Sequence, residues 1–181
     1  RTDIIYASNV ICHIPDLDDL IKAIDILLDK NGVFVFEEPY LGSMYEKVSY
    51  DQIYDEHIYI FSLSSIKKIF NLYDFELVDA IPQITHGGSM RYFIRRKNIS
   101  NINKDLNKLL DNEKRNKIDS ISKCLDFKRN CEQSRKKIVN KILDFKKDNF
   151  KICGYGATSK STTVLNYCNI GNEMIDFICD T

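Results

Sequence analysis

Apolar runs and helical repeats alternate at the start of the chain. Residues 4–7 form an apolar run without polar alternation, which is typical of a strand buried on both faces. Asp16 can then cap a helix whose apolar side chains recur at threes and fours as far as residue 28, and residues 30–32 (Lys-Asn-Gly) are expected to stop it. Residues 33–36 predict a second buried strand. Strand, helix and strand in this order predict a βαβ unit with parallel strands.

The next segments predict a helix followed by two strands. A helix that begins at Ser62 or Ser64 repeats apolar side chains at helical spacing as far as residue 73. Residues 75–80 predict a strand, and residues 91–95 alternate as another strand that can pair with it as a hairpin. The sequence Thr-His-Gly-Gly-Ser at 85–89 supplies the turn, because glycine adopts backbone conformations that other residues avoid. This turn either only joins the two strands or also contacts a substrate.

The second half of the chain predicts a long helical segment and then another βαβ unit. Residues 101–148 contain neither proline nor glycine and repeat apolar residues at threes and fours, which predicts one long helix or two. Residues 151–153 predict a strand, a Gly-x-Gly turn then opens a helix that reaches Cys168, and residues 175–178 predict a further strand. A helix N-terminus with exposed amides and small hydroxyls suits a phosphate, although many tight strand-to-helix turns use Gly-x-Gly without one.

Charge separates the helical segment from the rest. The 181 residues carry 26 basic and 26 acidic side chains, and this balance argues against nucleic-acid binding as the main function. Residues 1–97 hold 10 basic and 15 acidic residues, whereas residues 98–148 hold 14 and 8. The basic excess is most simply the solvated face of a helix. Because the sequence shows no bilayer-spanning apolar run and no secretory signal, we expect a cytoplasmic protein without a membrane partner.

The six cysteines predict neither a disulfide framework nor a metal site. They stand at positions 12, 124, 131, 153, 168 and 179 without a Cys-x-x-Cys pair, and the chain has three histidines. We therefore expect isolated, buried thiols and no metal ligands in this chain.

Titratable and aromatic residues concentrate at residues 50–57, whose sequence is Tyr-Asp-Gln-Ile-Tyr-Asp-Glu-His. His57 can act as a general base near neutral pH, and Tyr54 and Glu56 can orient it or hydrogen-bond a substrate. Aromatic residues continue at period two after His57, so the segment also has a side that packs. The alternative is a tyrosine-rich loop over a core, in which His57 is a structural residue.

Two polar segments follow the first two predicted strands, residues 8–13 and residues 37–40. Ligands of open parallel sheets bind beyond the carboxyl ends of the strands, so both segments are expected at one crevice. Nine residues tether the 50–57 segment to the second of them, which is enough to reach the same place. A plain strand at 50–57 would point Glu56 and His57 in opposite directions, so we predict irregular backbone near Asp55.

Four stretches together resemble one family, the sugar C-methyltransferases, which use S-adenosylmethionine to methylate C3 of nucleotide-linked 4-keto deoxysugars. They are residues 8–15, residues 32–42 continuing through 50–57, residues 86–91, and residues 154–160 continuing through 166–168. The resemblance runs nearly end to end and in the family's order. It implies an α/β fold in three parts: the second half of a Rossmann-like class I methyltransferase sheet at 1–97, a helical connector at 98–148, and at 149–181 the start of a second Rossmann-like βαβ domain that helps to hold the nucleotide-sugar.

The family also has a small zinc-binding N-terminal domain and a glycine-rich cofactor loop, neither of which has a counterpart in this sequence. Both ends of the chain adjoin apolar runs and look cut from a longer protein. We therefore expect the chain to be inactive alone and the zinc to belong to the parent protein's N-terminal domain. We also expect residues 3–8 to form a strand with one neighbour, whose other edge is covered by another chain or by protein outside this sequence.

The resemblance assigns roles to individual residues. It implies that His57 is the base that removes a proton beside the ketone, with Tyr54 and Glu56 as its catalytic neighbours. It implies contacts with S-adenosylmethionine at Ser8, Asn9 and His13. Contacts with the nucleotide-sugar substrate are expected at Glu38, Tyr40, His86, Ser89, Arg91, Gly154, Tyr155, Gly156, Ala157, Thr158 and Lys160.

Two other functions are compatible with the same residues. The loop at 154–160 would also serve a nucleotide-binding module without chemistry. An O- or N-methyltransferase of another small molecule would share the fold, but it would not need both a base and a group that stabilises an enolate.

Overall fold

The computed structural model of this chain describes residues 1–99 and 102–180. The chain forms two compact units. The first combines Arg1–Lys47 with Glu56–Ser120, and the second combines Val48–Asp55 with the residues from Ile121 onward.

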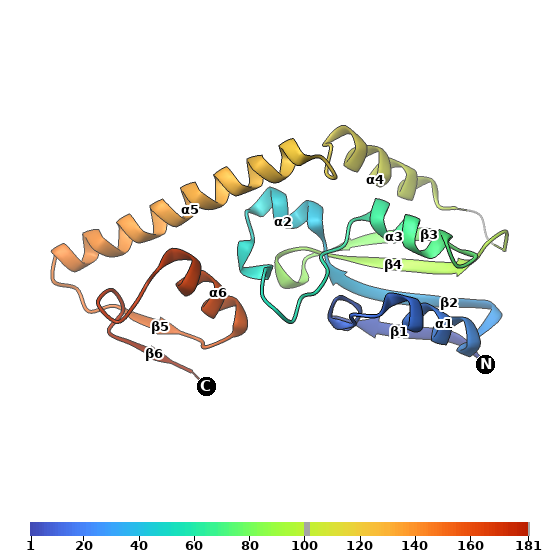
Figure 1. Cartoon of the computed structure of the whole chain (residues 1–181), viewed down its shortest axis with the longest axis horizontal. Helices are drawn as coiled ribbons and strands as arrows, with labels where there is room; N and C mark the ends of the chain where they lie inside the picture. Colours follow the sequence, from blue (N-terminus) through green and yellow to red (C-terminus); the bar gives the residue numbers. More distant parts are fainter. Residues whose placement is uncertain (100–101, 181) are drawn as a thin grey trace. The chain divides into compact units, whose positions relative to one another are not determined.

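The first unit is built on a four-stranded mixed sheet with the order β1-β2-β4-β3 (Figure 1). Its strands are β1 (Thr2–Ser8), β2 (Leu28–Pro39), β3 (Phe75–Gln83) and β4 (Ser89–Arg96). β1 and β2 are parallel, while β4 is antiparallel to both of its neighbours. The predicted α/β fold, the parallel pair and the hairpin are therefore confirmed.

The helices of this unit are α1 (Leu17–Leu27), α2 (Leu41–Lys47), α3 (Leu63–Asn71) and α4 (Lys104–Arg115), with short 3-10 turns η1 (Ile11–His13) and η3 (Thr85–Gly87). Two of these helices, α1 and α3, begin where the sequence predicted caps. The side chain of Asp16 accepts a hydrogen bond from the N–H of Asp19, and Ser62 and Ser65 form a reciprocal capping box. α1 ends earlier than we predicted, because Leu28 already pairs with Thr2 and is fully buried as the first residue of β2.

One face of the sheet carries the core. Phe34 lies opposite Ile94 and Phe36 opposite Tyr92, and the rings of Phe36 and Tyr92 stack with centroids 4.7 Å apart. α1, α3 and α4 all contribute buried apolar side chains to this same cluster, among them Ile21, Ile24, Ile66, Phe70 and Leu106. Burying each such side chain contributes roughly 1.5–3 kcal/mol, so this layer is the main stabilising element of the unit.

β1 is an edge strand, as predicted, because β2 is its one neighbour among the described residues. On the face opposite the core, Ile4 is 62% exposed and Tyr6 is 60% exposed. Tyr6 pairs with Val35, so the exposed ring continues an apolar row along this face.

The second unit contains η2 (Tyr50–Gln52), α5 (Ile121–Lys147), β5 (Cys153–Tyr155), α6 (Ser159–Cys168) and β6 (Phe177–Cys179). β5 and β6 pair in parallel, which confirms the second βαβ unit. The helical segment is two helices, and the break follows from its backbone. Asn116 caps α4, Lys117 has φ +49°, and Ile118 turns into a buried position.

Two further expectations can be compared with the structure. Cys12, Cys131 and Cys168 are buried, but the other three cysteines are exposed, so the expectation of six buried thiols was wrong for half of them. No helix within residues 1–99 and 102–180 is long and apolar enough to cross a membrane.

Candidate active site

Glu38, at the carboxyl end of β2, fixes the loop that follows β1. Its side chain is fully buried, and Oε1 accepts hydrogen bonds from the N–H groups of Val10 (2.9 Å) and Ile11 (2.6 Å). These groups open the turn η1, so the carboxylate caps that turn. Asn9, with φ +53°, donates its own N–H to the carbonyl of Glu37 at 2.9 Å. The two predicted segments therefore meet beyond the carboxyl ends of β1 and β2.

The second carboxylate oxygen of Glu38 has no hydrogen-bond partner among the residues the structure describes. The thiol of Cys12 lies against this carboxylate in a buried position. Burial, together with the adjacent negative charge of Glu38, raises the pKa of Cys12 well above its usual range. Without a cation at its sulfur, Cys12 is therefore held as a neutral thiol at neutral pH.

His13 and His57 lie side by side at the same end of the sheet, both half-buried. Their ring centroids are 5.1 Å apart and their planes are tilted by 47°. Nδ1 of His13 is 2.6 Å from the backbone oxygen of Glu56. A carbonyl can only accept, so Nδ1 carries the hydrogen and the neutral ring keeps its lone pair on Nε2.

The segment that carries His57 is also anchored beyond the histidine. The N–H of Tyr59 donates to the carbonyl of Cys12 at 3.2 Å, and its phenol donates to the carbonyl of Pro15 at 2.8 Å. With the bond from His13 to Glu56, three contacts join the 56–59 segment to the loop after β1. This anchoring brings His57 to the predicted crevice although it is remote in sequence from His13.

The backbone around Asp55 is irregular, as predicted: Tyr54 to Glu56 form a bend and a turn, not a strand or helix. The compact units change between Asp55 and Glu56, so His57 belongs to the first unit and Tyr54 to the second. Tyr50, the first residue of the cluster, is buried in the second unit with its phenol oxygen 3.6 Å from Sγ of Cys168. Burial above all raises the pKa of Tyr50 to about 12, so Tyr50 is a packing residue.

An ion pair between a buried glutamate and a partly exposed arginine stands next to Glu38 on the opposite face of the strand. Glu37 faces Arg91 across β2 and β4, and one of its oxygens accepts from Nη2 of Arg91 at 2.9 Å and from Nε at 3.2 Å. The hydroxyl of Thr85 donates to the other oxygen at 2.6 Å. Burial disfavours the charge of Glu37, but the bonds from Thr85 and Arg91 outweigh it and lower the pKa of the carboxyl.

The other predicted substrate residues of the first unit have varied surroundings. The phenol of Tyr40 donates to Glu113 at 2.8 Å, and burial and the negative charge of Glu113 raise the pKa of Tyr40 well above its usual range. Ser89 is buried and donates to the carbonyl of Thr85 at 3.1 Å. His86 is exposed in the turn η3 with φ +50°. Of these side chains, His86 is the one that faces solvent.

The glycine-containing turn of the second unit is open. Gly156 has φ +94°, and a Cβ placed there would meet nothing within 4 Å. Its N–H donates to the carbonyl of Cys179 at 2.7 Å, and Thr158 caps α6 by accepting from the N–H of Ser161 at 3.3 Å. Tyr155 is 78% exposed, and Ala157 is exposed as well. Gly154 packs closely on Ile178 of β6, while Lys160 is half-buried in the first turn of α6.

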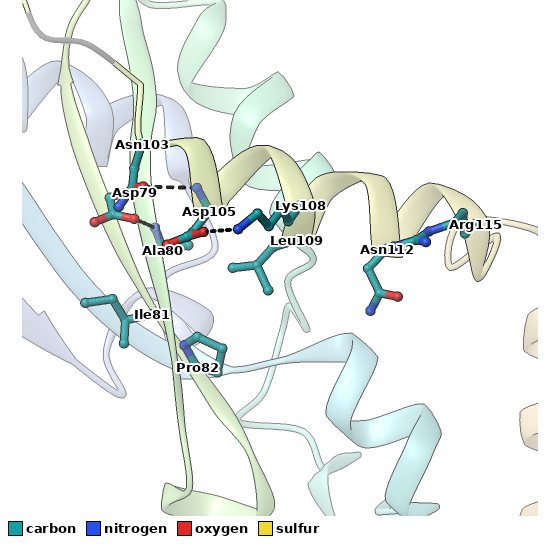
Figure 2. Close-up of a pocket in the computed structure, with 10 residues that line it drawn as sticks. All are labelled: Asp79, Ala80, Ile81, Pro82, Asn103, Asp105, Lys108, Leu109, Asn112 and Arg115. Carbon is teal, nitrogen blue, oxygen red and sulfur yellow. Dashed lines mark hydrogen bonds and ion pairs between the residues drawn. The ribbon is translucent and has the colours of Figure 1, made fainter.

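An open cavity of about 650 Å³ lies between β3 and α4, away from all these residues (Figure 2). Its rim groups bond to each other: Lys108 pairs with Asp105 at 2.7 Å, and Asn103 accepts from the N–H of Asp105 at 3.0 Å. None of the predicted site residues lines this cavity.

Sequence reasoning missed three residues of this region: Cys12, Glu37 and Glu113. Cys12 was set aside because it has no partner cysteine nearby in sequence. The Glu-Glu pair at 37–38 at a strand end was the available signal for Glu37. Glu113 lies in a helix rich in charged residues, and nothing in its neighbours marks it as buried.

Known proteins that are similar to this chain are methyltransferases. The family model described as C-methyltransferase C-terminal domain matches residues 84–181, and a model described as methyltransferase domain matches residues 1–80. The C-methyltransferase NovU of Streptomyces niveus is 27% identical over 179 residues, which are 98% of this chain and 43% of NovU. The chain therefore spans less than half the length of this relative. Because the first model covers more than half of the chain, the chain belongs to the C-methyltransferase family.

Proposed function

We propose that this chain is part of an enzyme that transfers a methyl group from S-adenosylmethionine to a carbon, C3, of a nucleotide-linked 4-keto deoxysugar. Membership of the C-methyltransferase family supports transfer to carbon. The keto-sugar follows from the resemblance of the sequence motifs. One observation carries the proposal: the half-buried imidazole of His57 lies beside the ring of His13 at the carboxyl ends of two parallel strands. His13 is itself held there by its hydrogen bond to the carbonyl of Glu56.

In this proposal His57 is the general base. A C–H bond next to a ketone is weakly acidic, so its cleavage needs a positioned base. The proton moves to an imidazole nitrogen of His57, and the electron pair of the C–H bond becomes the enolate. The enolate carbon then forms the new bond to the methyl group, while the bond between the methyl group and the sulfonium sulfur breaks and its electron pair stays on the sulfur. Tyr54 donates a hydrogen bond to the enolate oxygen, and Glu56 orients His57.

The site has groups suited to one part of the cofactor. S-adenosylmethionine supplies an electrophilic methyl group when it is bound. The exposed hydroxyl of Ser8, the amide of Asn9 and the imidazole of His13 line the loop after β1, where polar cofactor groups are held in parallel sheets. The buried carboxylate of Glu38 accepts hydrogen bonds from the N–H groups of Val10 and Ile11 and so fixes the backbone of that loop, which supports a rigid cofactor-binding loop.

The predicted substrate residues fall into two groups under this proposal. Glu38, Tyr40, Ser89 and Arg91 have their polar groups engaged with other parts of the protein, so they act by positioning the loops. The remaining groups, which are exposed or half-buried, contact the nucleotide-sugar directly: His86 in the first unit, and Gly154, Tyr155, Gly156, Ala157, Thr158 and Lys160 in the second.

We further propose the three-part division of residues 1–97, 98–148 and 149–181 as the domain organisation. The last part begins just before β5 and contains the whole β5-α6-β6 unit, which supports a nucleotide-sugar domain there. We also propose a cytoplasmic protein without a membrane partner, and the balanced charge argues against nucleic acid as a partner.

The decisive experiment replaces His57 by Gln and supplies a nucleotide-linked 4-keto deoxysugar and S-adenosylmethionine to the whole enzyme. We expect loss of methyl transfer by about 10²-fold or more, together with loss of hydrogen exchange between C3 and deuterated solvent. Retained exchange in His57→Gln would assign proton abstraction to another group. An unchanged thermal midpoint serves as the folding control. Methylation of an O- or N-nucleophile that survives the substitution would favour the third candidate, and binding of a nucleotide without any transfer would favour the second.

A further inference from the structure

Three groups with metal-binding chemistry meet beside the proposed base. Sγ of Cys12 and one ring nitrogen each from His13 and His57 lie within 4.8 Å of one another. Cys12 is buried and the two histidines are half-buried, so the thiol forms the floor and the imidazoles form the sides of the cluster. Two imidazoles and one sulfur are a donor set that favours Zn²⁺ over the hard cations Mg²⁺ and Ca²⁺.

The tautomer of His13 is one that metal ligands adopt. Its Nδ1–H is used by the carbonyl of Glu56 at 2.6 Å, so Nε2 carries the lone pair. Ligating histidines almost always donate their other N–H in this way, because the bond fixes both the tautomer and the ring direction. His57 directly follows Glu56, so the same backbone anchor sets the position of both rings.

Glu38 supplies an independent reason to expect a cation here. Its carboxylate is fully buried against Cys12, and its Oε2 lacks a hydrogen-bond partner within residues 1–99 and 102–180. A buried carboxylate oxygen without a partner is costly, and a cation bound at the neighbouring sulfur would reduce that cost. The carboxylate also stands where a proton from the thiol can be received.

We propose that Cys12, His13 and His57 form a binding site for Zn²⁺, with the fourth coordination position open to solvent. On binding, the S–H bond of Cys12 breaks, its electron pair forms the sulfur–metal bond, and the proton passes to the neighbouring carboxylate of Glu38. The lone pairs of both imidazoles bind the metal, so an occupied site removes His57 from proton transfer. Binding does not depend on the proposed function; its inhibitory consequence does.

Co²⁺ is the probe, because it replaces Zn²⁺ in such sites and has visible and near-ultraviolet bands that report sulfur ligation. We expect the purified protein to bind one equivalent with a sulfur-to-cobalt charge-transfer band, and Zn²⁺ but not millimolar Mg²⁺ to displace it. Cys12→Ser should abolish that band, and His57→Gln should weaken Co²⁺ binding by at least about tenfold. Cys124→Ser, which changes an exposed thiol on α5, is the matched control and should change neither.

Three results would overturn the proposal: a charge-transfer band that persists in Cys12→Ser, wild-type Co²⁺ affinity in His57→Gln, or equal competition by Mg²⁺. Cys12 lies in the core, so circular dichroism must first show that Cys12→Ser is folded. If Cys12→Ser is not folded, Cys12→Ala replaces it, because alanine places no hydroxyl in the core. His57→Gln then tests the site at a residue that is less buried than Cys12. The spectra need neither methyl donor nor sugar. A protein that binds Co²⁺ as described but whose His57→Gln form still methylates would refute the proposed function and leave the metal site standing.

Discussion

Glu113 offers the sharpest test of what holds the first unit together. It lies on α4 with only 2% of its surface exposed, and it accepts hydrogen bonds from two other segments. Oε1 receives the N–H of Leu63 at 2.7 Å and the phenol of Tyr40 at 2.8 Å. Oε2 receives the N–H of Ser64 at 2.9 Å and also its hydroxyl. The carboxylate thus satisfies the first N–H groups of α3, where the helix dipole favours a negative charge.

Glu113→Gln keeps the shape and removes half of this bonding. The amide has one carbonyl oxygen, which can serve one pair of donors, while its NH₂ group is turned toward the other pair. Each hydrogen bond to a charged group contributes about 1.5–3 kcal/mol, and a buried donor left without a partner costs about 1–3 kcal/mol. Allowing for local relaxation, we expect a loss of about 3 kcal/mol in the free energy of unfolding of the first unit.

The assay is urea unfolding together with amide hydrogen exchange at Leu63 and Ser64, which report on this unit directly. Asp111→Asn is the matched control, because it makes the same chemical change at an exposed position of the same helix. We expect it to alter stability by less than about 0.5 kcal/mol. If the two variants differ by less than about 1 kcal/mol, the carboxylate cap is not a principal tie between α3 and α4.

Three more predictions concern charge, backbone and thiols. The pKa of Glu37 is lowered in the folded state, so this carboxylate stabilises the fold at pH values above its ordinary pKa of about 4.5, and the stabilisation is lost as the pH falls through the lowered pKa. Arg91→Gln should therefore flatten the fall in stability below about pH 5, as measured by urea unfolding at several pH values. Gly88→Ala should cost more than Gly156→Ala, because both glycines have positive φ but only a Cβ at Gly88 would collide with Ser43; a thermal shift of equal size in both would contradict this. In the native protein a thiol reagent should react first with three cysteines, and mass spectrometry should find them to be Cys124, Cys153 and Cys179.

The order of elements could be predicted from the sequence because it depends on local patterns. The apolar run at 33–36, the capping serine before α3 and the Gly-x-Gly turn before α6 each fix a strand or helix within a few residues. The predicted boundary between α1 and β2 was wrong, because Leu28 pairs with Thr2 as the first residue of β2 and does not continue the helix before it. A local pattern cannot express that preference.

The candidate site shows a different limit, because the sequence reveals side chains but not the use of backbone groups. Glu56 drew attention as a carboxylate beside His57, yet the described contact with His13 is made by its carbonyl, and its side chain is exposed. Glu38 drew attention as a substrate ligand, yet its Oε1 caps the loop of Val10 and Ile11. In both cases the sequence named the residue that fixes the site, but the group to which that residue hydrogen-bonds lies far away along the chain. The close approach of Cys12 to His57 arises from the same two hydrogen-bonding groups, since the loop after β1 is fixed by the carboxylate of Glu38 and by the carbonyl of Glu56. A sequence pattern can therefore select the residues of such a site, whereas the chemistry that they share depends on long-range backbone bonds.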